Sequence, residues 1–194
     1  MTELTTEELM DTAWRWRRES FDWPLAARYS RLQAAGQLLD KAINSAITNS
    51  DDRNTAHAVH LLANLEVDVG RLDSALQLWS LAVELCRELN DPAMLAHKIR
   101  HLGDLFKQRR QFDEAHQCYE EALTLYRGLS EIENNIKLDI ANLLIRFAEI
   151  RENRTDNTTA LEYFVEAESL YKELELADGV ELCSKHIERL QKKS

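Results

Sequence analysis

The residues from Ala96 to Tyr126 read AHKIRHLGDLFKQRRQFDEAHQCYEEALTLY, and they decide the fold of this chain. The first half places a large apolar residue, a Leu-Gly pair and an aromatic residue on one face of a helix: Ile99, Leu102, Gly103 and Phe106. After a short polar break, the second half does the same with small and aromatic residues: Ala115, Tyr119 and Ala122. Small residues let two helices cross closely, and aromatic side chains fill the space beside them. The stretch therefore predicts a packed pair of helices.

The same pattern occurs on both sides of this stretch. Upstream it consists of Val59, Leu62, Ala63 and Gly70, then Ala75, Trp79 and Ala82, and downstream of Leu144, Phe147 and Ala148, then Ala160, Phe164 and Ala167. Ala75 and Ala115 lie 40 residues apart, and Ala115 and Ala160 lie 45 residues apart. Glu66 and Arg151 stand where the other copy has an aromatic residue, and the third copy lacks a glycine between its two helices. Three copies in one register predict a repeat protein.

This pattern resembles the tetratricopeptide repeat (TPR) family, in which a large apolar residue, Leu-Gly, Tyr, Ala, Phe and Pro stand at fixed offsets. The resemblance covers residues 56–190. The periods exceed the roughly 34 residues of the minimal repeat, so the chain is similar to the long repeats of the kinesin-light-chain-like type. The resemblance implies an all-α fold, an α-solenoid of antiparallel helix pairs wound into a right-handed superhelix.

Further helices are predicted on either side of the three copies. Residues 5–20 and 25–48 form two amphipathic helices, and Gly36 within the second suggests a close helix crossing. Residues 180–192 form a final helix that caps the stack, with one apolar face: Val180, Cys183, Ile187 and Leu190. We expect one compact domain with an N-terminal helical pair at 1–50, which can be read as a degenerate repeat, and three repeats with their cap at 51–194.

Composition narrows the classes of partner. The chain has 194 residues and a net charge of −10, which argues against general binding to nucleic acid phosphates. Cys86, Cys118 and Cys183 form no paired motif, which favours a reduced, cytoplasmic compartment. No apolar run approaches the roughly 20 residues that span a bilayer, and the acidic start MTELTTEELM is not a secretory signal. We expect no nucleic acid or membrane partner.

No motif points to catalysis. The sequence contains no glycine-rich phosphate loop, no paired-cysteine zinc pattern and no nucleophile elbow, so we expect no enzyme, no catalytic residue and no cofactor. Histidines three or four residues apart on a helix can chelate zinc, and four are so placed: His57, His60, His97 and His101. Neither a thiolate nor a second shell accompanies them, so no metal site is expected.

The resemblance assigns a binding surface. In the TPR family, the first helix of each repeat lines a concave groove that binds peptides. Transferred by register, the candidate ligand-binding residues are His57, His60, Asn64, His97, Arg100, His101, Asp104, Lys107, Asn142, Arg146 and Glu149. Some family members clamp the C-terminal carboxylate of chaperones with five residues; only Asn64 and Arg146 match, which does not support that specificity. The histidines and arginines predict instead a patch that holds an acidic segment and binds it more tightly as the pH falls toward 6, since free histidine titrates near about 6.5.

The functional prediction is a non-catalytic protein–protein interaction module, an adaptor or scaffold that binds a protein or peptide segment. Two alternatives stay open at this point. The chain could be an oligomerising subunit that uses the aromatic N-terminal helices, or a TPR-type chaperone. The N-terminal cluster AWRWRR at 13–18 is more simply interpreted as a helix that packs a broad apolar face on the next helix. Monomer and homodimer are both compatible with the sequence.

Overall fold

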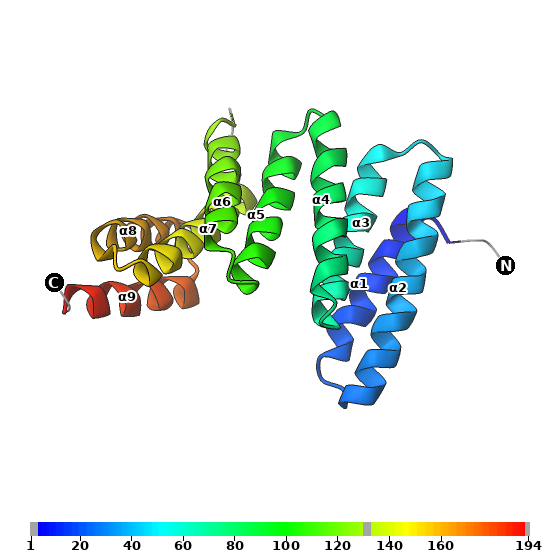
Figure 1. Ribbon diagram of the computed structural model, residues 1–194, viewed down its shortest axis with the longest axis horizontal. Coiled ribbons are helices and arrows are strands. Elements are labelled where there is room, and N and C mark those ends of the chain that lie inside the picture. The colour runs from blue at the N-terminus through cyan, green and yellow to red at the C-terminus, as the bar shows by residue number, and fades with distance from the viewer. Residues whose placement is uncertain (1–3, 130–132, 193–194) are drawn as a thin grey trace. The chain divides into compact units, whose positions relative to one another are not determined.

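The computed structural model describes residues 4–129 and 133–192, and the fold of these residues is all-α (Figure 1). The described residues form nine helices: α1 Thr6–Ser20, α2 Leu25–Thr48, α3 Asp52–Asp68, α4 Leu72–Glu88, α5 Pro92–Gln108, α6 Phe112–Arg127, α7 Asn134–Asn153, α8 Asn157–Glu173 and α9 Ala177–Gln191. Consecutive helices pack as antiparallel pairs, in the manner of a TPR solenoid, so the predicted fold class is confirmed. None of these helices has the length and apolarity that crossing a membrane requires.

The chain divides into two compact units, Met1–Asp91 (unit 1) and Pro92–Ser194 (unit 2). In unit 1, α1 packs on α2, α3 packs on α4, and α2 contacts α3. Unit 2 contains the pairs α5–α6 and α7–α8, with α9 packed on α8. The predicted boundary between residues 50 and 51 lies inside unit 1, between α2 and α3, and as a domain boundary it stays a prediction.

The first helix begins where its sequence predicts. The Thr5 hydroxyl accepts a hydrogen bond from the Glu8 backbone N–H at 3.2 Å, and the Glu8 carboxylate accepts one from the Thr5 N–H at 2.8 Å, which is a capping box. Trp14 and Trp16 pack against the core of unit 1. The Arg17 guanidinium lies 4.5 Å from the Trp14 ring centre. The tryptophan–arginine cluster is therefore part of helix packing, as its simpler interpretation predicted.

The close crossing predicted for the second repeat is confirmed. A Cβ atom at Gly103 would lie 2.5 Å from Cε1 of Tyr119 and 3.0 Å from Cβ of Cys118, both on α6. Ala115 and Tyr119 are completely buried. A second crossing of this kind was not predicted: a Cβ atom at Gly179 on α9 would lie 2.3 Å from the Tyr171 ring on α8.

The turns within the three repeats share one conformation. Gly70, Arg110 and Thr155 have positive φ angles of 80°, 62° and 60°. In each case the next residue donates its backbone N–H to the carbonyl five positions earlier; the pairs are Arg71 to Glu66, Gln111 to Phe106 and Asp156 to Arg151. These positions repeat at the spacings of 40 and 45 residues, so the register of the copies is correct. The second and third turns lack glycine but have the same geometry, which a non-glycine residue adopts at a cost of about 1 kcal/mol.

The close crossing predicted at Gly36 is wrong. A Cβ atom there would meet only the tip of the Leu62 side chain, at 3.9 Å, and no backbone of α3. A glycine within a helix looks the same in the sequence whether or not a neighbouring helix packs against it. The packing around Gly36 could therefore not be predicted from its position alone. Gly36 instead faces a pocket.

Candidate functional site

In unit 2 the candidate residues of the second and third repeats come together along α5 and α7. They are His97, Arg100, His101, Asp104 and Lys107 on α5, and Asn142, Arg146 and Glu149 on α7. We call the surface they form, together with Asp139, the α5–α7 face. The candidates of the first repeat, His57, His60 and Asn64, lie on α3 in unit 1 and are described separately.

Arg146 connects the two helices of this face. Its Nε lies 3.3 Å from Oδ1 of Asp104 on α5, and its Nη1 lies 3.5 Å from Oε2 of Glu149, one turn along α7. Lys107 on α5 also donates a hydrogen bond to Glu149. Burial acts to lower the pKa of Arg146, but the charges of Asp104 and Glu149 outweigh it and the pKa is raised. Arg146 therefore keeps its positive charge between the two carboxylates.

Asp139 is a site residue that sequence reasoning missed. Its carboxylate lies 3.4 Å from Nη2 of Arg100 and 3.1 Å from Nδ1 of His97, and it accepts a hydrogen bond from the Tyr126 hydroxyl at 2.9 Å. Burial acts to raise the pKa of Asp139, but the hydrogen bond with His97 and the charge of Arg100 hold it below its ordinary value. Its position carried a signal, since Asp139 lies seven residues before Arg146 and so shares its helix face.

The charges of the face balance. Three cations, Arg100, Lys107 and Arg146, meet three carboxylates, Asp104, Asp139 and Glu149. The cluster of positive charge that the sequence suggested is thus neutralised within unit 2. A partner that binds here exchanges ion pairs instead of meeting an uncompensated charge.

Tyrosines on the second helices of the repeats orient the polar side chains of the face. Tyr119 on α6 donates a hydrogen bond to Asp104 at 2.7 Å, and Tyr171 on α8 donates one to Asn142 at 2.8 Å. Burial and then the charge of Asp104 raise the pKa of Tyr119, so it keeps its proton and stays a donor. Sequence reasoning had assigned Tyr119 to packing alone.

An open pocket of about 310 Å³ lies on the face and is lined by Asp104, Lys107, Gln108 and Arg146. The Lys107 and Arg146 side chains are 24% and 40% exposed, so solvent reaches both cations. This is the position on the face where a partner's side chain can contact positive charge directly.

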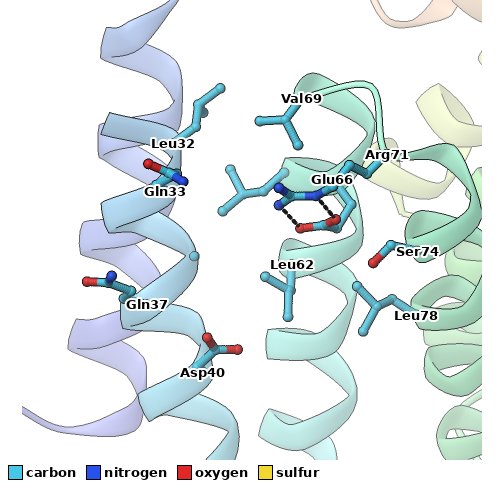
Figure 2. Close-up of a pocket in the computed structure, with 12 residues that line it drawn as sticks. Leu32, Gln33, Gln37, Asp40, Leu62, Glu66, Val69, Arg71, Ser74 and Leu78 are labelled. Carbon is cyan, nitrogen blue, oxygen red and sulfur yellow. Dashed lines mark hydrogen bonds and ion pairs between the residues drawn. The ribbon is translucent and has the colours of Figure 1, made fainter. Parts of the chain in front are cut away.

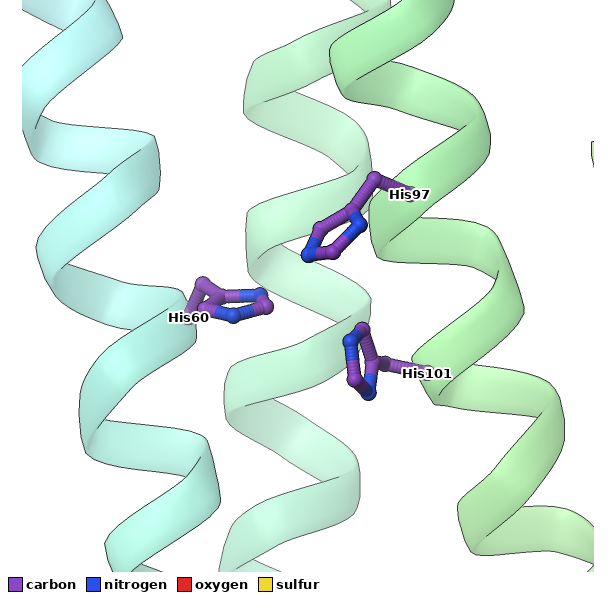
Figure 3. A group of neighbouring side chains, drawn as sticks. All are labelled: His60, His97 and His101. Atoms are coloured by element: carbon purple, nitrogen blue, oxygen red, sulfur yellow. The ribbon is translucent and has the colours of Figure 1, made fainter. Parts of the chain in front are cut away.

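The histidines are packed against rings and charged groups. The His97 and His101 rings project from α5 and meet edge to face at 4.7 Å, and Figure 3 labels both, with His60 on α3. Nε2 of His101 lies 2.9 Å from Nη2 of Arg100. In unit 1, His60 meets Trp79 edge to face at 4.4 Å and stacks with His57 at 6.0 Å.

Burial lowers the pKa of His101 well below its ordinary value, and the charges of Arg100, His97, Lys98 and Arg146 add to the effect. His101 therefore stays neutral where free histidine gains a proton. For this residue, the predicted gain of positive charge toward pH 6 is wrong, because desolvation and neighbouring cations oppose the imidazolium.

We expect the protein to lose stability as the pH falls below about 6.5. The pKa of His116 is also lowered, chiefly by burial. In this range the unfolded chain binds protons at both histidines that the folded chain does not, so protonation favours unfolding. The guanidinium chloride concentration at which half of the protein is unfolded should be lower at pH 5.5 than at pH 7.5. The variant with His101→Gln and His116→Gln should lose most of that difference, and equal wild-type midpoints at the two pH values would show that neither ring opposes protonation.

A separate apolar surface lies around the turn between α1 and α2. Phe21, Trp23, Leu25 and Tyr29 are 45%, 43%, 82% and 44% exposed. Arg28 covers part of it, with its guanidinium 4.3 Å from the Phe21 ring centre. The alternative of an oligomerising subunit named the aromatic N-terminal helices without choosing residues; Trp14 and Trp16 pack on the core, and the exposed aromatic residues follow them.

Solved structures with this fold come from several proteins. Similar structures include BtubC (BKLC) from P. vanneervenii, with 20% identity, a TM-score of 0.60 and coverage of 98% of this chain and 92% of that chain. Kinesin light chain TPR-like repeats from Podospora anserina give 14% identity, a TM-score of 0.57 and coverage of 99% and 98%. At these identities the likeness concerns the fold. A search of curated proteins finds no match.

One similar structure is named as an enzyme. The aspartyl phosphate phosphatase F of Bacillus subtilis gives a TM-score of 0.72 at 12% identity, and the match covers 90% of this chain but 44% of the phosphatase. TPR folds are typically non-catalytic, but this example shows that the fold also occurs in proteins with an enzymatic name.

The family assignment rests on sequence and structure together. Residues 54–128 match the tetratricopeptide repeat family, and this range contains the first two predicted copies. The third copy has the same helices and turn geometry. Residues 54–128 therefore match the tetratricopeptide repeat family, and the fold of the chain is like that of kinesin-light-chain-like repeat proteins.

Proposed function

We propose that the chain is a protein-interaction module whose α5–α7 face binds a carboxylate-bearing segment of a partner protein. TPR modules generally serve protein–protein interaction, and the proposal assigns that role to this face. The observation that supports it is the open pocket at which Lys107 and Arg146 meet solvent. The face binds and performs no chemistry.

The ion pairs of Arg146 can be exchanged at small cost. They span 3.3 and 3.5 Å, and the side chain is 40% exposed. Exposed ion pairs contribute about 0–1 kcal/mol, so a partner carboxylate can compete with Asp104 or Glu149. Guanidinium can hold the incoming carboxylate with two parallel hydrogen bonds.

The carboxylates that Arg146 releases keep other partners. Asp104 accepts a hydrogen bond from Tyr119, and Glu149 accepts one from Lys107. Neither is left unpaired when Arg146 turns to a ligand, which would otherwise oppose binding. The exchange therefore conserves most of the polar contacts of the face.

A random peptide library displayed on phage tests the proposal. The full chain should select peptides rich in Asp and Glu, and their binding should weaken with added salt. In fluorescence anisotropy, the variant with Lys107→Ala and Arg146→Ala should bind the selected peptides about tenfold more weakly or worse, a loss of about 1.4 kcal/mol. Arg127→Ala is the matched control because Arg127 is also ion-paired in unit 2, with Glu166 at 2.5 Å, but on another surface.

Two results would contradict this assignment. One is selection of neutral or basic peptides. The other is equal binding by the wild type and the double variant while both keep the same helical circular dichroism. If Trp23→Ala and Leu25→Ala remove binding instead, the apolar surface at the α1–α2 turn is the interaction site. A homodimer in a solution mass measurement that Leu25→Ala converts to monomer would then favour the oligomerising subunit.

A further inference from the structure

Unit 1 contains a pocket that the α5–α7 face does not involve. It has a volume of about 440 Å³ and lies between α2, α3 and the start of α4 (Figure 2). Its lining residues are Leu32, Gln33, Gly36, Gln37, Asp40, Leu62, Leu65, Glu66, Val69, Arg71, Ser74 and Leu78. This volume lies within the usual range of ligand pockets, about 300–1,000 Å³.

Two features of the sequence keep this pocket open. Glu66 lies 40 residues before Phe106 and so holds the position at which the second repeat has an aromatic ring. Opposite it, Gly36 contributes no side chain, and a Cβ atom there would find no atom nearer than 3.9 Å. A glycine inside a helix costs about 1 kcal/mol relative to alanine. No close helix contact requires Gly36, so its clear structural consequence is the space that it leaves.

The wall formed by α3, α4 and the turn between them is mixed: Leu62, Leu65, Val69 and Leu78 lie beside an ion pair, Glu66 with Arg71, and Ser74. Leu65 on α3 is buried, as is Leu32 on the opposite helix α2. Arg71 donates two hydrogen bonds of 2.5 Å to the two carboxylate oxygens of Glu66, which Figure 2 shows as dashed lines. Hydrogen bonding to Arg71 lowers the pKa of Glu66, with a smaller contribution from Ser74. The pair is bidentate and satisfied within the protein, so a ligand need not supply a charge to it and can place an apolar group against Leu62, Val69 and Leu78.

The wall formed by α2 is polar and unengaged. Gln33, Gln37 and Asp40 follow one another along the same face of α2, and all three are exposed. Within residues 4–129 and 133–192, no hydrogen bond or ion pair engages any of the three. The glutamine amides can pair with a peptide backbone, because each offers both a donor and an acceptor. Asp40 supplies an unpaired negative charge at the rim, on a chain whose net charge is −10.

We propose that this pocket binds a short segment of a partner protein that carries a large apolar side chain, such as phenylalanine, close to a lysine or arginine. The apolar side chain enters the space between Gly36 and the leucines of α3. The cation meets Asp40, and the glutamines bind the backbone between the two. This recognition chemistry differs from that of the α5–α7 face, which takes carboxylates, so the two sites fit different segments.

Three short peptides test the proposal: acetyl-Phe-Ala-Lys-amide, acetyl-Phe-Ala-Glu-amide and acetyl-Ala-Ala-Lys-amide. Each is titrated into the full chain labelled with ¹⁵N, and backbone amide shifts are followed by NMR. The first peptide should give saturable shifts confined to the segments 33–40 and 62–74. The other two should bind about tenfold more weakly, because each lacks one of the two recognised groups.

Two variants locate the binding. Gly36→Leu fills the pocket and should reduce the affinity for the first peptide about tenfold or more. Asp40→Asn changes an exposed side chain without disturbing the core and should remove the preference for lysine over glutamate. The Lys107→Ala and Arg146→Ala substitutions, which lie in unit 2, should leave these shifts unchanged. Any one of three results would overturn the proposal: no saturable shifts, equal binding of the lysine and glutamate peptides, or unchanged affinity in the Gly36→Leu variant. These results do not depend on whether the α5–α7 face binds a carboxylate.

Discussion

Gly103→Leu is expected to lower the free energy of unfolding by about 3 kcal/mol. Even the first atom of the new side chain would lie 2.5 Å from Cε1 of Tyr119, a ring that is completely buried. The ring cannot move away easily, because its hydroxyl donates a hydrogen bond to Asp104. The close packing of α5 on α6 must therefore open, and the helices of unit 2 lose contacts on both sides.

Gly36→Leu is the matched control for this experiment, because it makes the same change in the middle of another helix. Its side chain enters open space, so it should raise the free energy of unfolding by about 1 kcal/mol through helix propensity alone. Unfolding in guanidinium chloride, followed by circular dichroism, measures the free energy of unfolding of both variants. The interpretation of Gly103 would be wrong if the two leucines shift the midpoint in the same direction.

Removing residues 177–194 is expected to destabilise unit 2 by at least about 3 kcal/mol, or to make the protein aggregate. The cut deletes α9, whose Cys183 and Leu190 are buried, and uncovers Phe164 and Tyr171 on α8. Burial of one large apolar side chain contributes about 1.5–3 kcal/mol, and this truncation exposes several. Size-exclusion chromatography and circular dichroism of the truncated chain measure the effect.

A point variant distinguishes the loss of α9 packing from the effect of shortening the chain. Leu190→Asp places a charge in the buried contact and should approach the effect of the truncation. Leu182→Lys lies on the exposed side of the same helix and should change stability by less than about 0.5 kcal/mol. A soluble truncated protein with an unchanged unfolding midpoint would mean that α9 contributes no packing energy to α8.

The helices and their repeat register could be predicted from the sequence because their signals are local. Apolar residues at helical spacing define the faces, and the recurring small and aromatic residues locate the crossing at Gly103 and Ala115. The turn at Thr155 shows how strong this pattern is. It and the turn at Arg110 keep the φ angle of the first turn without its glycine, because the helices on either side impose the geometry.

The candidate site could be predicted only in part, since register assigns residues to a face but does not pair them. Arg146 and Glu149 were identified by position, and the structure brings them together with Lys107. Asp139 was missed, although it neutralises Arg100 and holds His97. A resemblance to a family identifies the positions that the family uses for binding. It does not identify a charged residue beside those positions, such as Asp139.

The sequence by itself determined the all-α repeat architecture, the phase of each helix and the acidic character of the chain, since these depend on residue order and composition. The tertiary structure decided which glycine packs against another helix, which cations form ion pairs, and which histidine has a lowered pKa. Gly36 and Gly103 both lie within an amphipathic helix, and the sequence predicts a close helix crossing at each. They differ because the Tyr119 ring packs against one of them and only the tip of Leu62 approaches the other. Crowding, charge balance and desolvation depend on distances between residues far apart in the chain, and those distances exist only after the helices have packed.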